Sequence, residues 1–472
     1  MTDTAIADPG ADLAGEPLTE AAAHDVDRGA LPPAPEPYRT RRERFIEQIG
    51  GGVAVICGAP ELILSRDTEI NYRQNSELYY LTGFPEPAVA VLTPHDAEHR
   101  FTLFVRPRDP EKETWNGRRA GVEGARDEYG ADAAYPLDEL DQRLKELLEP
   151  ASHLWYSLGS DEAMDRRLIG WIREWRQRHA RTGKGTTEVL DPCLAVDAMR
   201  LVKEPGELEL IRQACRLSAD GHLRAMRSAR PGMGEWELEA LLDGTFRAAG
   251  PRCGTAYPTI VGSGPNACIL HYVTNDRRSE DGDLVLIDAG ASVGLYCGDI
   301  TRTFPVNGRF TPAQRRVYEI VLRAEEAAIA AARPGATVIE LHETVRGELV
   351  RGMVELGLLE GDPAELMEGE EYKRYFMHQT SHWLGLDVHD AGSYRGRSGG
   401  EWVPLAPGMV LTIEPGLYIA PDAPDVPDEL RGIGVRIEDD VLVTGDGCEI
   451  LTRHVPVDPD EIERLVGTAA RE

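Results

Sequence analysis

LVLIDAGASVGLYCGDITRTFPV, residues 284–306, is the segment that decides the fold of this chain. Its first four residues are apolar and partly β-branched, which predicts a strand that is buried on at least one face and ends at Asp288. Residues 295–306 predict a second strand, which Gly298 interrupts immediately before Asp299. Since an isolated charge is costly away from water, both carboxylates require partners.

The elements expected around this segment indicate an α+β domain over residues 191–472. Thr311 and Pro312 are a preferred N-cap and a preferred first helical residue. Helices are predicted from Pro205 to about Met226, at 235–249, from Pro312 to about Arg333 and at 337–357. Strands are predicted at 254–262, 283–289, 382–389, 409–419, 432–438 and 440–444. Helices combined with an antiparallel sheet are typical of an α+β fold.

Residues 38–190 have a different pattern, which predicts a smaller α/β domain. Helical stretches near 137–149 and 161–180 alternate with short apolar runs at 53–57, 88–93, 102–105 and 153–157. TGKG at 182–185, followed by Asp191-Pro192, is the expected linker. Residues 1–37 carry eight acidic residues against one arginine, and we expect them to form a disordered tail.

The composition excludes several classes of protein. The 472 residues include 51 Lys and Arg against 81 Asp and Glu, and the resulting net charge of −30 repels nucleic acid and anionic membranes. The sequence shows neither an apolar run long enough to span a bilayer nor an export signal, so we expect a soluble, cytoplasmic protein. Seven scattered cysteines without a CxxC pair indicate reduced thiols.

Further polar residues follow apolar β runs in the second domain. His382 lies in MHQTSHWLGLDVHD (377–390), Glu414 in VLTIEPG (410–416) and Glu438 in GVRIEDD (434–440). Each alone is adequately explained as a turn residue, a satisfied core histidine or a solvated strand end. Together with Asp288 and Asp299 they place four carboxylates and one imidazole at strand ends. Two divalent cations would balance the four negative charges and leave the imidazole as a neutral ligand.

The donor types indicate which metals and which chemistry to expect. Two metal ions about 3.5–4 Å apart generate a bridging hydroxide and stabilise a tetrahedral intermediate. A set of oxygen donors with a single nitrogen favours Mn²⁺, while Zn²⁺, Co²⁺ and Fe²⁺ remain open. Nucleotide-binding and serine-hydrolase motifs are absent from the sequence, and GSGPNA at 262–267 has too few glycines for a nucleotide fingerprint.

The order of these motifs resembles a known family. LIDAG, GDITRTFPV, HQTSHWLGLDVHD, TIEPGLYI and GVRIEDD resemble the metallopeptidases of the pita-bread fold, and within them the aminopeptidase P family. The resemblance extends over about residues 40 to 465 and includes YRQNSELYYLTGF (72–84) and WNGRR (115–119). It implies a dinuclear metal site in which Asp299 and Glu438 bridge the ions. The implied metal ligands are Asp288, Asp299, His382, Glu414 and Glu438.

The resemblance also implies roles for residues around the metal ligands. The implied substrate-binding residues are Tyr257, His271, His378, His389, Arg436 and Trp115. We expect His271 and His389 to stabilise the carbonyl oxygen and Glu414 to transfer the proton, which makes these three the catalytic residues. Tyr418 and Arg436 are expected behind the ligands, with Arg436 holding Asp288.

Loops of the first domain, some of them reaching in from a neighbouring subunit, are expected to close the site. Trp115 would form a wall beyond the substrate's amino group, and Asp67 would attract its ammonium, with coordination of the neutral amine by a metal as the alternative. The alternative for both residues is an ordinary surface position. The chain departs from the family at Gln379, where glycine is expected.

These observations predict a manganese-dependent aminopeptidase that acts on peptides with proline in second position. The chain is expected to form a homo-oligomer, a dimer or a tetramer. One alternative is a prolidase, which has the same fold and metal site but cleaves Xaa-Pro dipeptides only. Another is a catalytically inactive peptide-binding protein, against which the presence of all five ligands argues.

Overall fold

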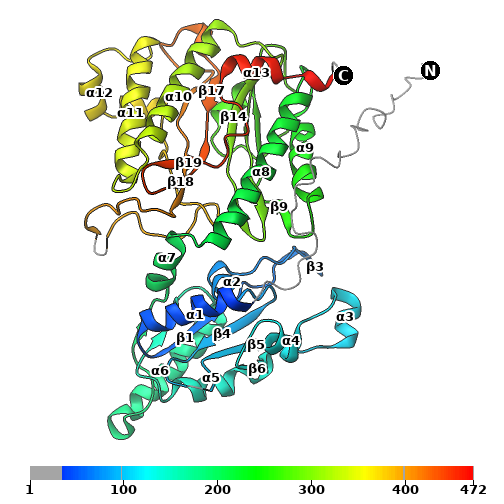
Figure 1. Ribbon diagram of the computed structural model, residues 1–472, viewed down its shortest axis with the longest axis vertical. Coiled ribbons are helices and arrows are strands. Elements are labelled where there is room, and N and C mark those ends of the chain that lie inside the picture. Colours follow the sequence, from blue (N-terminus) through cyan, green and yellow to red (C-terminus); the bar gives the residue numbers. More distant parts are fainter. Residues whose placement is uncertain (1–34, 97, 397–398, 471–472) are drawn as a thin grey trace, which may run out of the picture.

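The structure, a computed structural model, describes residues 35–470 except 97 and 397–398. Figure 1 shows two lobes, the first formed by the N-terminal part of the chain and the second by the rest, with helix α7 (Cys193–Leu201) between them. Of the predicted tail 1–37, residues 1–34 lie outside the described residues. The prediction is wrong for residues 35–37, because helix α1 (Pro35–Ile49) begins there.

The first lobe is built on a mixed six-stranded sheet in the order β6-β5-β4-β1-β7-β8. The strands are β1 (Val53–Cys57), β4 (Ala88–Leu92), β5 (Phe101–Val105), β6 (Ala133–Pro136), β7 (Leu154–Trp155) and β8 (Val189–Leu190). Strands β1, β4 and β5 are buried along their whole length. Their sequences are apolar throughout because the sheet is buried on both faces, each of which packs against its own cluster of apolar side chains.

Helices pack on both faces of this sheet. The helices of the lobe are α1, α2 (Ser76–Thr82), α3 (Pro110–Asn116), α4 (Gly121–Asp127), α5 (Leu140–Leu148) and α6 (Glu162–Thr182). A short hairpin, β2 (Ile63–Ser65) and β3 (Thr68–Glu69), lies apart from the main sheet.

The linker expected at 182–185 is wrong. Gly183 ends α6 in a left-handed conformation, with φ of 63°. Residues beyond it return to the sheet, where β8 pairs in parallel with β7. The TGKG segment is therefore a turn inside the first lobe, and its glycines provide the positive φ values that the turn requires.

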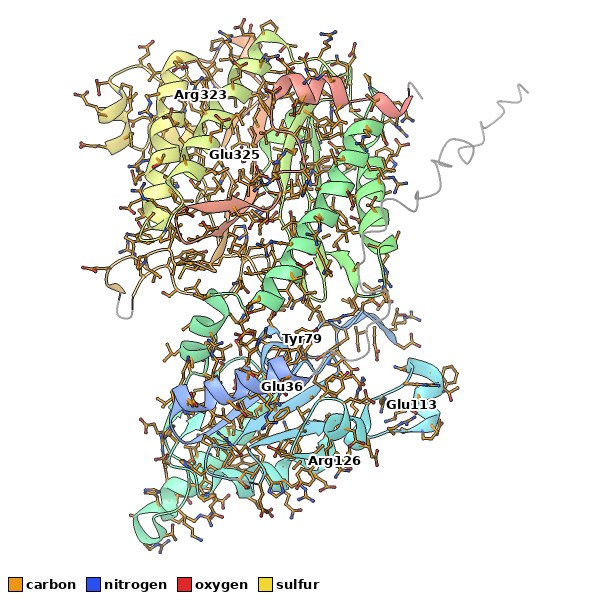
Figure 2. The ribbon with its side chains drawn as sticks, in the orientation of Figure 1. Glu36, Tyr79, Glu113, Arg126, Arg323 and Glu325 are labelled. Atoms are coloured by element: carbon orange, nitrogen blue, oxygen red, sulfur yellow. The ribbon has the colours of Figure 1, made fainter. Side chains whose placement is uncertain are left out.

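Long helices cover the second lobe. They are α8 (Pro205–Ser228), α9 (Glu235–Ala248), α10 (Pro312–Ala331) and α11 (Val338–Glu355), with the shorter α12 (Pro363–Glu368) and α13 (Pro459–Leu465). The expected N-cap is present, because the Thr311 side chain accepts a hydrogen bond from Gln314 N. In α10, Arg323 forms a surface ion pair with Glu355, whereas Glu325 is buried; Figure 2 shows both residues.

Short antiparallel strands form the centre of the second lobe. Three sheets of three strands have the orders β10-β11-β14, β13-β12-β9 and β15-β18-β19, and β16 pairs with β17. Their bounds are β9 (Cys253–Thr255), β10 (Ile260–Ser263), β11 (Leu284–Asp288), β12 (Ala291–Val293), β13 (Tyr296–Cys297), β14 (Thr301–Pro305), β15 (Val410–Ile413), β16 (Gly416–Ile419), β17 (Ile433–Arg436), β18 (Asp439–Val443) and β19 (Cys448–Ile450). Helices thus combine with antiparallel strands as predicted.

One predicted strand is wrong. Residues 382–389, all of which the structure describes, form turns instead. Gly385 N donates to Asp387 O, Asp390 N donates back to Trp383 O, and a single bridge joins Trp383 to Leu411. The segment folds back on itself at Gly385, where a Cβ atom would lie 2.2 Å from Asp390.

Gly298 has a clear packing function. A Cβ atom at this position would lie 2.9 Å from Cys215 N in helix α8. The chain therefore passes directly against the helix just before Asp299. The interruption of the strand predicted at 295–306 follows from this contact, which only glycine permits.

Buried ion pairs fix the turn segment to the junction of the lobes. Asp390 accepts from Arg200 at 2.5 Å and from Lys203 at 2.7 Å, and all three are buried. Asp387 accepts from Arg200 and, at 2.8 Å, from Arg73 of the first lobe. Burial alone would raise the pKa of Asp390, but Lys203 and Arg200 outweigh it and hold that pKa below its usual value.

Replacing this carboxylate tests the junction. Asp390→Asn leaves the buried Lys203 without a carboxylate partner and Arg200 with Asp387 alone, and it is expected to lower the free energy of unfolding by about 3 kcal/mol at pH 7. Because the folded-state pKa is depressed, the stabilisation is complete above the unfolded pKa of about 3.9 and is lost as pH falls through the lower folded value. Urea denaturation measures both effects. Equal stability of Asp390→Asn and the exposed control Asp422→Asn would contradict this account.

Candidate active site

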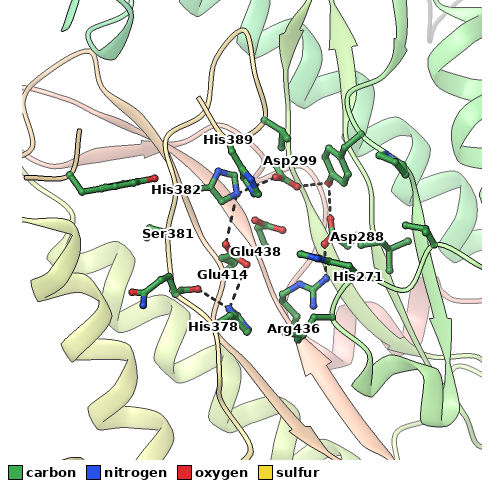
Figure 3. Close-up of a pocket in the computed structure, with 18 residues that line it drawn as sticks. His271, Asp288, Asp299, His378, Ser381, His382, His389, Glu414, Arg436 and Glu438 are labelled. Carbon is green, nitrogen blue, oxygen red and sulfur yellow. Dashed lines mark hydrogen bonds and ion pairs between the residues drawn. The ribbon is translucent and has the colours of Figure 1, made fainter. Parts of the chain in front are cut away.

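A cavity of about 670 Å³ in the second lobe contains all five predicted metal ligands. Its lining also includes the predicted substrate-binding residues Tyr257, His271, His378, His389 and Arg436 (Figure 3). Residues as far apart in the sequence as Tyr257 and Glu438 therefore meet in one site.

Strand ends place the carboxylates. Asp288 is the last residue of β11, and its backbone pairs with Thr301, the first residue of β14. Thr301 in turn forms an isolated bridge with Glu438, whose N–H donates to Thr301 O at 3.0 Å. Asp299 precedes β14 and Glu414 follows β15. Antiparallel pairing thus brings separate strand ends to one point.

His382 faces the carboxylates with one ring nitrogen. Its Nε2 lies 3.6 Å from Asp299 Oδ2 and 3.8 Å from Glu414 Oε1. Its Nδ1 lies 3.1 Å from the carbonyl oxygen of Trp383, which fits a protonated Nδ1 and a free lone pair on Nε2. Burial and the neighbouring His389 lower the pKa of His382 to about 4, so the imidazole is neutral at pH 7.

Three of the five residues form a compact donor set. Ligand atoms of Asp299, His382 and Glu438 all lie within 4.8 Å of one another. Figure 3 shows Glu414 beside this set and Asp288 on its other side. Glu414 and Asp288 thus extend the donor set on two sides, which gives it room for more than one cation.

Mutual repulsion dominates the electrostatics. Burial and then Glu438 raise the pKa values of Asp299 and Glu414 well above their usual range. Burial and then Asp288 raise the pKa of Glu438 to about 8. The site cannot hold all these carboxylates ionised without added positive charge. The donor set therefore fits two divalent cations, which would supply the missing charge.

Asp288 is held from two sides. Tyr257 donates from Oη to Asp288 Oδ1 at 2.7 Å and also contacts Asp299. Arg436 donates from Nη2 to Asp288 Oδ2 at 2.5 Å, the contact expected from the sequence. Both partners fix the orientation of the carboxylate.

Arg436 also supports Glu438 through Thr301, and His378 through Tyr418. Its Nε donates to Thr301 Oγ1 at 3.2 Å, and that hydroxyl donates to Glu438 at 2.6 Å. Its Nη1 lies 3.0 Å from Tyr418 Oη, which lies 2.9 Å from His378 Nε2. Burial and then Arg436 lower the pKa of His378 to about 4, so this ring is also neutral.

His271 and His389 lie on different sides of the carboxylates. The His389 ring packs on His382 with centroids 4.3 Å apart. Figure 3 shows His271 near Asp288 and Arg436. Donors on two sides of the cavity are suited to bind a substrate carbonyl between them.

Two supporting residues were missed by sequence reasoning. Thr301 links Arg436 to Glu438, as described above. Asp440, fully buried, accepts from Asp299 N at 2.8 Å and thereby fixes the backbone of that residue. The run of three acidic residues at 438–440 indicates that Asp440 has a partner of its own, because adjacent strand residues point to opposite faces of a sheet.

Two predicted residues do not reach the cavity of their own chain. Trp115 lies in α3 and is 83% exposed, and Asp67 is exposed in the turn between β2 and β3. Neither is among the described residues that line the cavity. Gln379, the departure from the expected glycine, is an exposed residue of the lining.

Comparisons with known proteins agree over most of the chain. Sequence models of metallopeptidase family M24 and of the aminopeptidase P N-terminal domain match residues 209–445 and 38–155. The chain is 44% identical to the Xaa-Pro aminopeptidase of Escherichia coli over 441 residues, covering 92% of this chain and 98% of the relative.

Solved structures show the same similarity. The structure of Pseudomonas aeruginosa aminopeptidase PepP has a TM-score of 0.88 at 48% identity, over 92% of this chain and 98% of that one. The structure of Escherichia coli aminopeptidase P with the inhibitor Pro-Leu has a TM-score of 0.87 at 44% identity, over 93% of this chain and 99% of that one. The predicted fold class, a pita-bread domain preceded by a smaller α/β domain, is therefore confirmed.

Removing one ligand tests the metal site. Asp299→Asn or Glu438→Gln takes away one negative charge, so the affinity for the second ion is expected to fall at least about tenfold, and turnover with it. Metal analysis after gel filtration measures the number of ions per chain, with the exposed Asp422→Asn as control. Two tightly held ions and unchanged turnover in either variant would contradict the assignment.

Proposed function

Because the chain belongs to metallopeptidase family M24, we propose that it is an Xaa-Pro aminopeptidase, which releases the first residue of peptides whose second residue is proline. One observation carries the proposal: four carboxylates and one imidazole line a cavity that also contains further histidines. The near full-length similarity to the Xaa-Pro aminopeptidase of Escherichia coli supports the substrate class.

Five residues would hold two divalent ions. The proposed ligands are Asp288, Asp299, His382, Glu414 and Glu438. When bound, such ions supply Lewis acidity and lower the pKa of water. Oxygen donors with one imidazole favour Mn²⁺. Zinc is the competing ion to test, since one related solved structure is a zinc-substituted Escherichia coli aminopeptidase P in complex with product.

Glu414 is the proposed proton carrier. Its carboxylate lines the cavity, and His378 and His382 face it at 3.8 Å. We infer that Glu414 accepts a proton from the attacking water as the new carbon–oxygen bond forms. It then delivers that proton to the proline nitrogen as the carbon–nitrogen bond breaks. This delivery is essential because the departing amine is basic.

The histidines are proposed to bind the substrate carbonyl and the proline ring. His271 and His389 would donate to the carbonyl oxygen, where negative charge develops. A proline in second position presents a fixed ring and an amide without N–H. The side chains of Tyr257, His378 and Arg436 offer a shallow surface for it, and Tyr418 fixes the His378 ring.

Replacing His389 tests this assignment. His389→Ala is expected to lower kcat by roughly 10²–10³ with metal content intact, because one preorganised donor is lost. Steady-state kinetics and metal analysis on the same preparation measure both quantities. A variant that loses its metal while the loaded fraction keeps full activity would show that His389 is structural instead.

Substrate comparison tests the reaction class. We expect cleavage of Xaa-Pro-Yaa at a rate at least about tenfold above that of Xaa-Ala-Yaa, and no cleavage of the N-acetylated Xaa-Pro-Yaa peptide. Discrimination on this scale corresponds to about 1.4 kcal/mol in transition-state binding. Cleavage of Xaa-Pro alone, with the tripeptide left intact, would favour the prolidase alternative. Equal rates on the alanine peptide would exclude the Xaa-Pro preference.

Assembly and location complete the proposal. The exposed Trp115 would reach the site of a neighbouring copy and close it beyond the substrate's amino group. We therefore propose that the chain forms a homo-oligomer, either a dimer or a tetramer. The proposed location is the cytoplasm. None of the described helices is long and apolar enough to cross a membrane. Light scattering after gel filtration measures the assembly, and a monomer with full activity would exclude this role of Trp115.

A further inference from the structure

The loop that carries His271 is irregular but strongly anchored. It connects β10 to β11, begins with a short 3₁₀ turn at Gly264–Cys268 and continues without regular structure to Arg277. His271 itself is exposed, and its ring forms no hydrogen bond with another described residue. The position of this ring therefore depends on how its neighbours in the loop are held.

Glu235 is the anchor of the loop. It is the first residue of α9, is 1% exposed and accepts five hydrogen bonds. Oε1 accepts from Ser263 N and Ser263 Oγ, both at 2.7 Å, and from Asn266 Nδ2 at 3.1 Å. Oε2 accepts from Tyr272 Oη and Arg277 N, both at 2.8 Å. One buried carboxylate thus contacts the beginning, the middle and the end of the loop.

The contact nearest to His271 is the one through Tyr272, the next residue. Its ring is buried among Ile260, Leu286 and Tyr418. With the hydroxyl held by Glu235 and the ring held by packing, the backbone at 271–272 has one preferred position. Asn275 adds a second fixed point, because its side chain bonds to Val261 N and Thr259 O of the adjacent chain segment.

We infer that Glu235 is a positioning residue for His271. Glu235 does not belong to the lining of the cavity as far as the chain is described, so it acts through the loop and not on the substrate. The inference rests on the proposed role of His271 in binding the substrate carbonyl. A histidine on an exposed loop can serve as a preorganised donor only if the loop is fixed, and Glu235 accepts five of the hydrogen bonds that fix it.

A double-mutant cycle separates positioning from a general structural effect. The kcat for an Xaa-Pro-Yaa peptide is measured for the wild type, Glu235→Gln, His271→Ala and the double variant, each with its metal content. Glu235→Gln is expected to lower kcat roughly 10- to 100-fold in the wild type, the scale of a displaced catalytic group. In the His271→Ala background the same change is expected to have less than about a twofold effect, with metal content unchanged throughout.

The matched control is Glu237→Gln on the same helix turn. The Glu237 carboxylate accepts from Gly234 N at 2.6 Å and pairs with Arg278. The same Glu-to-Gln change is therefore made at a carboxylate that does not bond to the loop between Ser263 and Arg277. This variant is expected to keep the wild-type kcat. If Glu235→Gln does not fold, Tyr272→Phe enters the same cycle, since it removes the hydroxyl that contacts Glu235 and Asp276 and leaves the Glu235 carboxylate in place.

Other outcomes of the cycle would overturn either the positioning role of Glu235 or the substrate-binding role of His271. An equal loss of kcat in both backgrounds, or no loss in Glu235→Gln while His271→Ala is impaired, would overturn the positioning role alone. An unimpaired His271→Ala would instead overturn the proposed role of His271, and the positioning role with it.

Discussion

Four carboxylates that repel one another inside a single cavity impose the main electrostatic requirement on the second lobe. Asp288, Asp299, Glu414 and Glu438 line one cavity, and the pKa values of the last three are raised by burial and by their neighbours. Such a cluster is unstable unless it is neutralised. Arg436 is the one arginine or lysine among the described residues that line the cavity, so most of the negative charge is left for bound metal ions to balance.

The cluster persists because its carboxylates are attached to paired strand ends and not to flexible loops. Thr301 pairs with both Asp288 and Glu438, so three strands are held in register at the site. Asp440 fixes the backbone of Asp299. Ion pairs of Asp387 and Asp390 hold the turn segment that carries His382 and His389 against the lobe junction. The fold therefore maintains a constellation that repulsion alone would disperse.

Much of this was predictable from the sequence, for physical reasons. Apolar runs that end in a carboxylate are unusual, because buried charge is costly, and this allowed Asp288 and Glu414 to be recognised. The N-cap at Thr311 follows from a local rule that needs no tertiary context. The fold class was predictable as well, since the alternation of elements differs between the two parts of the chain.

Contacts between distant segments were not predictable. The strand expected at 382–389 is replaced by turns because Asp390 pairs with Arg200 and Lys203, almost 190 positions away. The anchoring function of Glu235 was equally hidden, since a glutamate in the first turn of a helix normally interacts with the helix end. Trp115 could not be placed, because its exposure in one chain leaves its partner undefined.

Diffraction from crystals of the manganese-loaded protein tests whether the cavity binds two metal ions. Anomalous differences measured near the manganese absorption edge locate each ion without reference to activity. We expect two peaks per chain inside the cavity, with Asp299 and Glu438 between them. A single peak, or peaks outside the set formed by the four carboxylates and His382, would contradict it.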